Sequence, residues 1–338
     1  MKIKKQCHQA FLGMILIALI IPSFCINDNQ SSSYNTYQMD TTLLNELDLT
    51  RIYNITEHLS SYKTRMTGTL ESNLAASYIH SMLNETYNLT DIFYEDFIYN
   101  ETICSNLVAR INGSNLKDEL IIISAHYDSI STLGDAPGAN DNAVAVAVCM
   151  EIMGIIQNNM ILNRTLLFVS FSGEEQAFIG SQAWIHQHKA ELSQIVAVIN
   201  LDMIGYGDRL SIIKNDQSEW LADAVISASS AINVTFTKSN SLYPETARFD
   251  HDTFWLAQVP CVTLFEAGAI YPHYHTSQDT IDKISFHLVE KCAQVTLLSI
   301  FYLGTIKFQH NLLISSLIIW VSWALAAILP LLIYKKRR

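Results

Sequence analysis

Glycine and proline are scarce in this chain, with 12 and 6 among 338 residues. This composition excludes collagen-like and low-complexity architectures, and no repeat of the length that a solenoid needs is visible. Charged residues are also few, at 16%, whereas 49% of the residues are hydrophobic. A chain of this length and composition can bury a sizeable core and is not intrinsically disordered.

Basic residues are few, and a third of them lie at the two ends of the chain. Seven of the 21 lysines and arginines fall within residues 2–5 and 335–338, which contain no acid. The rest of the chain therefore holds 14 basic residues against 32 acidic ones, a net charge of −18. This charge argues against nucleic acid as a partner and is compatible with cationic ligands or simply with a well-solvated surface.

The chain also lacks the Cys-X-X-Cys spacing of a zinc knuckle. Its central part contains four cysteines, namely Cys104, Cys149, Cys261 and Cys292. Two disulfides would be possible in an oxidising compartment. Because Cys149 and Cys261 lie in apolar runs, buried free thiols are the alternative.

The N-terminal segment has the pattern of a secretory signal peptide. Basic residues within 1–5 precede twelve uncharged residues, 10–21, a stretch that is short for a membrane span. The cleavage site is poorly defined, because the bulky Phe24 stands where a small residue is expected, so an uncleaved anchor is the alternative. We assign residues 1–26 to the signal peptide and 27–44 to a polar linker.

An uncharged run of 23 residues, 312–334, is followed at once by the basic residues 335–338. About 20 apolar residues span a bilayer, and a basic cluster beside a span stays on the cytoplasmic side. The pattern predicts a single C-terminal transmembrane helix, a short cytoplasmic tail and a globular part outside the cytoplasm. A buried core helix is the alternative, although such a helix rarely lacks polar residues on every face.

Eight Asn-X-Ser/Thr glycosylation sequons favour the same topology. With 22 asparagines in the chain, chance gives roughly three or four such sites. The excess suits an extracytoplasmic domain, although the Asn-, Ser- and Thr-rich composition could account for part of it. The eight asparagines are Asn29, Asn54, Asn84, Asn88, Asn100, Asn112, Asn163 and Asn233.

Between the two ends, apolar strand-like runs alternate with helical patterns. The predicted strands are residues 93–98, 106–111, 120–125, 165–171, 195–201 and 259–265. The predicted helices are two pieces of residues 43–83, broken near 67–69, and residues 143–158, 176–191 and 219–231. This alternation predicts one α/β domain over residues 45–310, with three layers: an open, mostly parallel or mixed sheet and helices on both faces.

Polar residues follow directly after the apolar strands of this predicted sheet, where open α/β sheets bind their ligands. Imidazoles and carboxylates without thiolates suit zinc or a similar divalent ion, and a metal pair also needs one carboxylate to bridge it. The residues at the strand ends or in the loops that follow are His126, Asp128, Asp141, Glu174, Glu175, Asp202 and His275.

Each of these residues also has an ordinary structural explanation. Asp141 alone could cap a helix, and His126 could be a satisfied histidine at a strand end. Glu174 and Glu175 could be solvated acids in the first turn of a helix. Their joint placement is hard to obtain by accident, and two adjacent acids after a buried strand are costly without a counter-charge. The joint pattern therefore favours a metal site.

Five segments resemble the ordered signature of the M28 family of zinc aminopeptidases. They are His126-Tyr127-Asp128-Ser129, Gly138-Ala139-Asn140-Asp141-Asn142, Ser172-Gly173-Glu174-Glu175, Asn200-Leu201-Asp202-Met203 and Tyr274-His275-Thr276-Ser277-Gln278-Asp279-Thr280. The resemblance extends over roughly residues 45–305 and includes Arg65-Met66-Thr67-Gly68-Thr69. Five motifs in this order are highly specific for the family and much less so for the substrate.

The resemblance implies two Zn²⁺ ions, or other divalent ions, bridged by Asp141. His126 and Asp202 would complete one metal site, and Glu175 and His275 would complete the other. Members of the family have a cis peptide bond after the bridging aspartate, so we expect the bond that follows Asp141 to be cis.

The resemblance also implies roles for residues around the metals. Glu174 would be the general base, and Asp128 would orient His126. Tyr274 would stabilise the developing oxyanion, because related enzymes carry a tyrosine before this histidine. Arg248 precedes a Phe-Asp-His segment where the family commonly has Ser-Asp-His; it could bind a substrate carboxylate or form a surface salt bridge.

Together these features predict a membrane-anchored metallo-exopeptidase that hydrolyses N-terminal residues of peptides outside the cytoplasm. The free N-terminus of the substrate would bind among the acids. One alternative is a glutaminyl-cyclase-like enzyme on the same fold, whose members place Trp where this chain has Tyr274. Another is a non-catalytic receptor that kept the fold, but such relatives usually lose metal ligands, and all five are present here.

Overall fold

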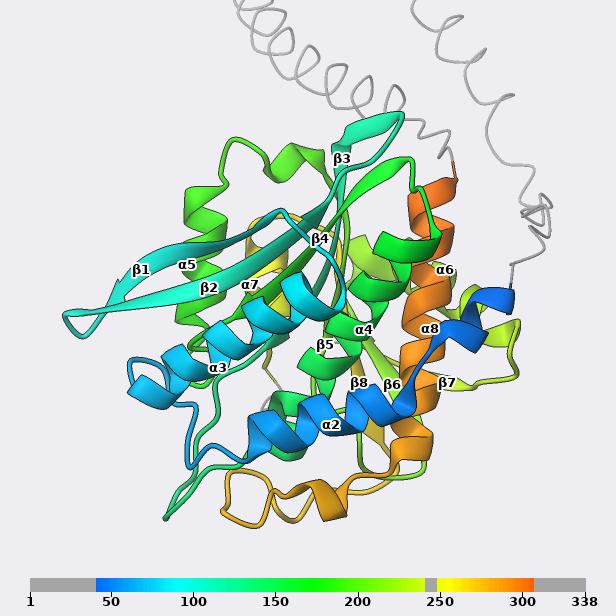
Figure 1. Ribbon diagram of the computed structural model, residues 1–338. Helices are drawn as coiled ribbons and strands as arrows, with labels where there is room; N and C mark the ends of the chain where they lie inside the picture. The colour runs from blue at the N-terminus through cyan, green and yellow to red at the C-terminus, as the bar shows by residue number, and fades with distance from the viewer. Residues whose placement is uncertain (1–40, 241–247, 307–338) are drawn as a thin grey trace, which may run out of the picture. The chain divides into compact units, whose positions relative to one another are not determined.

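The computed structural model describes residues 41–240 and 248–306, and within them it forms an eight-stranded sheet (Figure 1). The strand order is β1-β2-β4-β3-β5-β8-β6-β7. The strands are β1 (Ile92–Tyr99), β2 (Thr102–Ile111), β3 (Leu116–His126), β4 (Arg164–Phe171), β5 (Ile195–Leu201), β6 (Arg209–Lys214), β7 (Phe236–Asn240) and β8 (Cys261–Ala267). The predicted signal peptide and membrane span lie outside the described residues.

The middle of the sheet is parallel, as the sequence predicts, and its two sides make it mixed overall. β3 pairs in parallel with β4 and β5, and β5 pairs in parallel with β8. The hairpin of β1 and β2 joins β4 in antiparallel orientation. On the other side, β6 is antiparallel to β8 and parallel to β7. The carboxyl ends of β3, β4, β5 and β8 therefore meet at one edge.

Helices cover both faces of the sheet and complete the predicted three layers (Figure 1). Helices α2, α3, α4, α6 and α8 pack on one face, and α5 and α7 pack on the other. The helices are α2 (Leu49–Ser60), α3 (Leu70–Ser81), α4 (Val144–Asn159), α5 (Ile179–Gln187), α6 (Glu219–Ser230), α7 (His251–Leu256) and α8 (Phe286–Thr305). Short helical turns are η2 (Thr41–Glu46), η3 (Met82–Thr86), η4 (Ala139–Ala143), η5 (Leu192–Gln194), η6 (Asp216–Ser218) and η7 (Ile281–Lys283).

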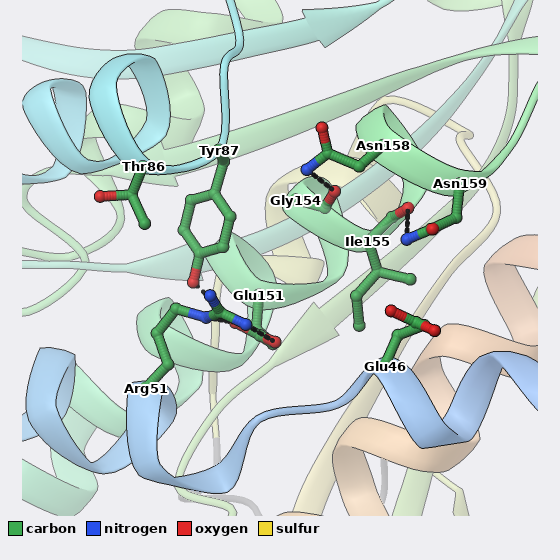
Figure 2. A pocket seen from close by; sticks show the side chains of 9 residues that line it. All are labelled: Glu46, Arg51, Thr86, Tyr87, Glu151, Gly154, Ile155, Asn158 and Asn159. Carbon is green, nitrogen blue, oxygen red and sulfur yellow. Dashed lines mark hydrogen bonds and ion pairs between the residues drawn. The ribbon is translucent and has the colours of Figure 1, made fainter.

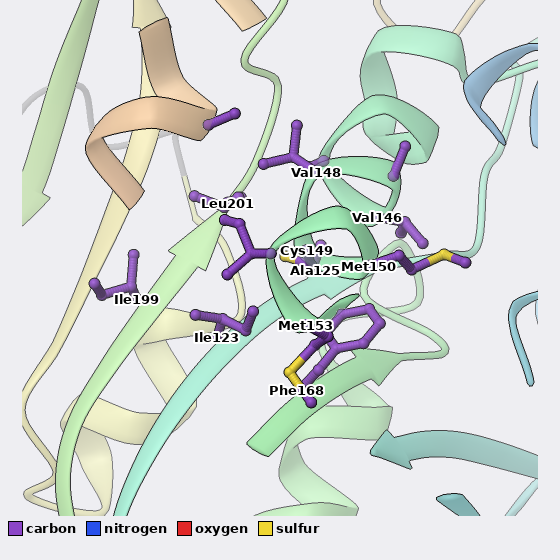
Figure 3. Close-up of a cluster of buried hydrophobic side chains, with 14 of the residues drawn as sticks. Ile123, Ala125, Val146, Val148, Cys149, Met150, Met153, Phe168, Ile199 and Leu201 are labelled. Atoms are coloured by element: carbon purple, nitrogen blue, oxygen red, sulfur yellow. The ribbon is translucent and has the colours of Figure 1, made fainter. Parts of the chain in front are cut away.

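Strand β3 shows how the sequence produces two cores. Successive side chains of a strand point to opposite faces, so Ile121 and Ile123 pack in the core that contains α4, whereas Leu120 and Ile122 pack in the core that contains α5 and α7. Figure 3 shows Ile123 close to side chains of α4. The unbroken apolar sequence of this strand is thus explained by burial on both faces.

Helix α4 is the central helix of the larger core, and its thirteen residues 144–156 are all buried. Together with η4 it forms Ala139–Asn159, the one helical segment among the described residues that is long and apolar enough to cross a membrane. This segment is entirely buried inside the protein, and a buried core helix can be as long and as apolar as a membrane span. The separate prediction of a span at residues 312–334 falls on residues that the structure does not describe.

Several elements differ from the sequence prediction. Strands β6 and β7 and helices α7 and α8 were not predicted. Helix α5 is shorter than the predicted 176–191, because Ala177 and Phe178 both adopt positive φ angles of 63° and delay its start. The four cysteines of the described part are buried free thiols, so the alternative to two disulfides is confirmed.

Candidate metal centre

The carboxyl ends of three neighbouring strands bring together four of the predicted site residues. β3 ends at His126, and Asp202 follows β5 at once. Glu174 and Glu175 lie just beyond the end of β4. His126 and Asp202 are 1% exposed, Glu174 is 8% exposed, and the side chain of Glu175 is 4% exposed. The cluster occupies the edge where open α/β sheets bind ligands.

Asp141 lies in η4 between two histidines. Its Oδ1 is 3.3 Å from Nε2 of His126, and its Oδ2 is 3.3 Å from Nε2 of His275. The peptide bond between Asp141 and Asn142 is cis, as expected from the family resemblance. Because its two oxygens face different partners, Asp141 is arranged as a carboxylate shared between two cations would be.

The remaining predicted ligands complete two groups around Asp141. Asp202 Oδ2 lies 3.4 Å from Nε2 of His126, and Glu175 Oε2 lies 2.8 Å from Nε2 of His275. Ligand atoms of His126, Asp141 and Glu175 all lie within 4.8 Å of one another. Five residues from separate parts of the sequence therefore converge in one small volume.

Several buried atoms of this cluster make no hydrogen bond to the described residues: Asp141 Oδ2, Glu175 Oε1, Asp202 Oδ2 and His275 Nε2. His275 Nε2 comes close to two carboxylates, but these contacts lack hydrogen-bond geometry, as expected of atoms that point to a common position between them. Unpaired buried carboxylate oxygens are costly. The set of nitrogen and oxygen atoms fits a divalent cation such as zinc.

Negative charge is in excess at this position. Burial raises the pKa of Asp202 to about 6, and burial together with the charge of Asp141 raises the pKa of Glu175 to about 8. Burial alone would lower the pKa of His275, but Asp141 and Glu175 outweigh it and raise this pKa to about 10. The cluster therefore favours any added positive charge, which a metal ion would supply.

A sequence model described as "Peptidase family M28" matches residues 106–300, which is more than half of the chain. The chain belongs to peptidase family M28. The matched part contains His126, Asp141, Glu174, Glu175, Asp202 and His275.

Curated relatives of this M28 chain have aminopeptidase names, and solved structures share its fold. A "Probable leucine aminopeptidase" of Arthroderma otae is 30% identical over 179 residues, covering 49% of each chain. Another of the same name, from Trichophyton verrucosum, is 26% identical over 254 residues, covering 72% of this chain and 70% of the relative. The LapA aminopeptidase of Legionella pneumophila has a similar fold, with a TM-score of 0.71, 21% identity and coverage of 80% and 75%. The chain spans about half the length of the first relative.

In this M28 chain, Asp128 contacts His126 through its main chain and the residues after β4 through its carboxylate. His126 Nδ1 donates to the main-chain carbonyl of Asp128 at 3.1 Å, while the Asp128 carboxylate is 3.5 Å away. Because a carbonyl only accepts, this bond leaves Nε2 of His126 free to face the cluster. The carboxylate instead accepts the backbone N–H groups of Glu174 and Glu175, each at 3.2 Å.

Three further predicted site residues are Glu174, Tyr274 and Arg248. Burial raises the pKa of Glu174 well above its usual value. Tyr274 is 51% exposed and stacks on His275 with 3.7 Å between ring centroids. Arg248 forms an ion pair with Asp252, with Nε 2.7 Å from Oδ2, so the surface salt bridge that the sequence leaves open is present. Binding of a substrate carboxylate by Arg248 stays a prediction.

Sequence reasoning missed three buried acids beside the centre, Asp250, Glu266 and Asp279. Burial raises the pKa of Asp250 to about 7 and that of Glu266 to about 8. Glu266 Oε2 accepts from the side-chain amide of Asn140 at 2.9 Å. Asp250 and Asp279 lie inside two segments that resemble family motifs, 249–251 and 274–280, so their place in the sequence could have indicated a position beside the centre. Glu266 lies in β8 without any such signal.

Glu151 in α4 is also buried, but it differs from the carboxylates of the candidate metal centre because both of its oxygens accept hydrogen bonds (Figure 2). Arg51 Nε and Tyr87 OH both donate to its Oε2 at 2.7 Å, and the Asp48 N–H donates to its Oε1 at 3.0 Å. A hollow of about 180 Å³ lies beside it. The hollow is lined by Glu46, Arg51, Thr86, Tyr87, Glu151, Gly154, Ile155, Asn158 and Asn159. These bonds fasten α2 and the end of η3 to α4.

Proposed function

We propose that this M28 chain is a dinuclear zinc aminopeptidase, a hydrolase that removes the N-terminal residue of peptides. The observation that carries the proposal is the convergence of five ligand-type side chains, with Asp141 between two histidines and with unpaired buried atoms. His126, Asp141 and Asp202 would hold one ion, and Asp141, Glu175 and His275 would hold the other. The relatives named leucine aminopeptidase support the same activity.

Glu174 is proposed as the general base. Bound zinc would polarise the water and the scissile carbonyl. Glu174 would accept the proton of the attacking water and pass it to the departing amine. Burial raises the pKa of this carboxyl, and a raised pKa suits a group that must both take and release a proton near neutral pH. Its backbone N–H is held by Asp128, which keeps the carboxylate beside the ligands.

Tyr274 is proposed to stabilise the oxyanion that develops on the substrate carbonyl. Burial and then the charge of Asp141 raise the pKa of this phenol above its usual value, so the hydroxyl stays protonated and can donate. Its ring stacks on His275, which places it at the rim of the centre. The free ammonium group of the peptide would be attracted by the excess of carboxylates, which explains why an exopeptidase site is acidic.

We also propose that the enzyme is a single-pass membrane protein whose catalytic domain lies outside the cytoplasm. The proposed organisation is a signal peptide or uncleaved anchor (1–26), a linker (27–44), the peptidase domain (45–310), a transmembrane helix (312–334) and a cytoplasmic tail (335–338). The sequence patterns of the two ends support this topology.

The direction of α8 supports an active site that faces away from the membrane. At the start of α8, the Ser285 N–H donates to the Gly205 carbonyl beside the metal centre, at 2.7 Å. At its end, the Asn163 N–H donates to the Gly304 carbonyl at 2.8 Å, at the opposite edge of the sheet. A helix of 20 residues is about 30 Å long. The described part of the chain therefore ends, at residue 306, at the edge of the sheet far from the site.

The exposure of the sequons supports glycosylation on the outside of the cell. Six sequon asparagines of the described part are exposed, namely Asn54, Asn84, Asn88, Asn100, Asn112 and Asn233. Asn163 is half-buried, and its Nδ2 donates to the Thr305 carbonyl at 2.7 Å. Asn84 Nδ2 likewise donates to the Leu89 carbonyl, at 2.8 Å. We therefore expect glycans at the other five exposed positions rather than at Asn84 or Asn163.

Metal content and turnover of the purified full chain test the proposed activity. About two zinc ions per chain are expected, with release of amino acids from a panel of aminoacyl-naphthylamides that stops on chelation and returns with zinc. Active protein without metal would contradict the proposal. Cyclisation of N-terminal glutamine would favour the glutaminyl-cyclase alternative, and metal-free, inactive protein would favour the receptor.

Protease added to intact cells tests the topology. The globular domain should be digested while an epitope on residues 335–338 stays protected. Protection of the whole chain would reverse the proposed orientation.

A further inference from the structure

The segment that carries Asp141, η4, is not a regular α-helix but a π-helical turn, in which the Ala143 N–H donates to the Gly138 carbonyl at 3.0 Å. Gly138 is in the left-handed region, with φ 54° and ψ 48°, and Asp141 and Asn142 have non-helical dihedral angles. Residues 139–142 are all buried. Buried backbone N–H groups need partners, so the N–H groups of this segment must be satisfied from outside it.

Asp279 accepts three consecutive N–H groups of this segment. Its Oδ1 accepts from the Asn140 N–H at 2.9 Å, and its Oδ2 accepts from the Asp141 N–H at 3.0 Å. Its main-chain carbonyl accepts from the Ala139 N–H at 3.1 Å. Asp279 is 2% exposed, so these bonds are shielded from water. Bonds from N–H groups to a carboxylate are among the stronger hydrogen bonds.

Asp279 belongs to the loop that presents His275. The Asp279 N–H donates to the Thr276 carbonyl at 3.1 Å, and the Tyr271 hydroxyl donates to Asp279 Oδ1 at 2.6 Å. These bonds close the loop on itself around the carboxylate. One side chain thus joins the backbone of Asp141 to the loop of His275, the two residues that face each other across the centre at 3.3 Å.

The fully buried guanidinium of Arg65 supports the same segment from another side. It donates from Nη2 to the Gly138 carbonyl at 2.9 Å. Burial lowers the pKa of Arg65 to about 10, and Asp279 is the carboxylate that opposes this shift most strongly. A positive charge near Asp279 explains how this carboxylate can remain buried beside other acids.

We propose that Asp279 is a positioning residue that holds the backbone of Asp141 in register with His275, so that ligands on both sides keep the spacing that zinc requires. Asp128 holds the backbone of Glu174 and Glu175 in the same manner, with each of its oxygens on one N–H. The proposal rests on the proposed function, because it takes Asp141 and His275 as metal ligands. Partners that orient ligands typically contribute about 10- to 100-fold in metal affinity.

The test uses the full chain with the substitutions Asp279→Ala and Asp279→Asn. Asp279→Ala removes both carboxylate bonds, so zinc affinity, measured by competition with a chelator, should fall about 10- to 100-fold. Asp279→Asn keeps one acceptor oxygen and should have a smaller effect. Asp282→Asn, an exposed change of the same type on the same stretch of chain, is the control and should leave zinc affinity within about threefold.

Two readouts separate positioning from a general loss of stability. Hydrogen exchange of a peptide containing residues 139–141, measured in metal-free protein, should be at least about tenfold faster in Asp279→Ala and unchanged in Asp282→Asn. The visible spectrum of the cobalt-substituted protein should change in Asp279→Ala, because it reports ligand geometry. Reduced thermal stability with wild-type zinc affinity and cobalt spectrum would overturn the proposal.

The remaining outcomes are also decisive. If Asp279→Ala does not fold, wild-type zinc affinity in Asp279→Asn overturns the proposal and weaker affinity supports it. If the wild-type chain binds no zinc, the proposed function fails. The hydrogen-exchange measurement still shows whether Asp279 holds the backbone of residues 139–141. Exchange at the wild-type rate in Asp279→Ala would overturn the positioning role of Asp279 as well.

Discussion

Two buried carboxylates ten residues apart in sequence, Asp141 and Glu151, have opposite surroundings. Both Glu151 oxygens are occupied by donors from Arg51, Tyr87 and the Asp48 backbone. Asp141 Oδ2 makes no hydrogen bond to the described residues. A buried acid whose oxygens are all paired inside the protein needs no ligand, whereas one left unpaired among other acids is suited to hold a cation. Burial and charge alone would not distinguish the two positions.

The largest difference between the two carboxylates should be in metal binding. Asp141→Asn removes the negative charge that the two proposed ions share, so we expect loss of both zinc ions and of all measurable turnover. The protein with the matched change Glu151→Gln should retain both zinc ions, because the hydrogen-bond partners of Glu151 are Asp48, Arg51 and Tyr87 and none of them is a proposed ligand. Elemental analysis and naphthylamide hydrolysis measure both. An Asp141→Asn protein that still binds zinc and is active would show that Asp141 and Glu151 do not differ in metal binding.

Within the metal centre, the neighbours Glu174 and Glu175 should separate catalysis from binding. Glu174→Gln should keep its zinc and lose roughly 100-fold or more in kcat, the usual contribution of a general base. Glu175→Gln should instead lose metal, because its oxygen faces His275 at 2.8 Å. Steady-state kinetics with metal analysis of the same samples tests this. A near-normal kcat in Glu174→Gln would exclude it as the base.

The Glu151 cluster should matter for stability and not for turnover. Glu151→Gln removes the nearer carboxylate partner of Arg51, leaving Asp48 at 3.6 Å, and weakens the bond from Tyr87. Removing one member of a buried pair costs roughly 3 kcal/mol. Because Arg51 is 36% exposed, water can partly replace the lost partner. Urea unfolding should show the loss, with kcat/KM unchanged. Equal stability of Glu151→Gln and wild type would mean that the cluster does not fasten α2 to α4.

The smallest effect is expected at a partly exposed charge cluster, where His188 lies 2.9 Å from both Glu95 and Glu191. Burial lowers the pKa of His188, but the two hydrogen-bonded carboxylates outweigh it and raise this pKa. The stabilisation is therefore complete below the unfolded pKa of about 6.5 and is lost as pH rises through the higher folded value. Denaturant unfolding of wild type and His188→Gln between pH 5 and 9 should show a difference of less than about 1 kcal/mol at low pH that vanishes at high pH. A difference independent of pH would exclude this explanation.

Local patterns predicted the elements that are strongly apolar or strongly periodic. The run 165–171 corresponds to β4 (Arg164–Phe171), and 195–201 corresponds to β5 (Ile195–Leu201). Strand β6 was missed because it is short and bounded by Arg209 and Lys214, which interrupt an apolar run. A short strand such as β6 is stabilised by pairing with its neighbours in the sheet, and the local sequence does not show which segments will pair.

Residue types and apolar runs were enough to predict the candidate metal ligands, because ligand chemistry depends on residue type and the strand ends could be read from the apolar runs. The sequence also determined the family. How these residues are held, and which buried acids are paired, depends instead on contacts between distant parts of the chain. Asp279 meets Asp141 across 138 positions of the chain, and Glu151 meets Arg51 across 100. Such contacts form only when the whole sheet and its helices have packed, so no local pattern encodes them.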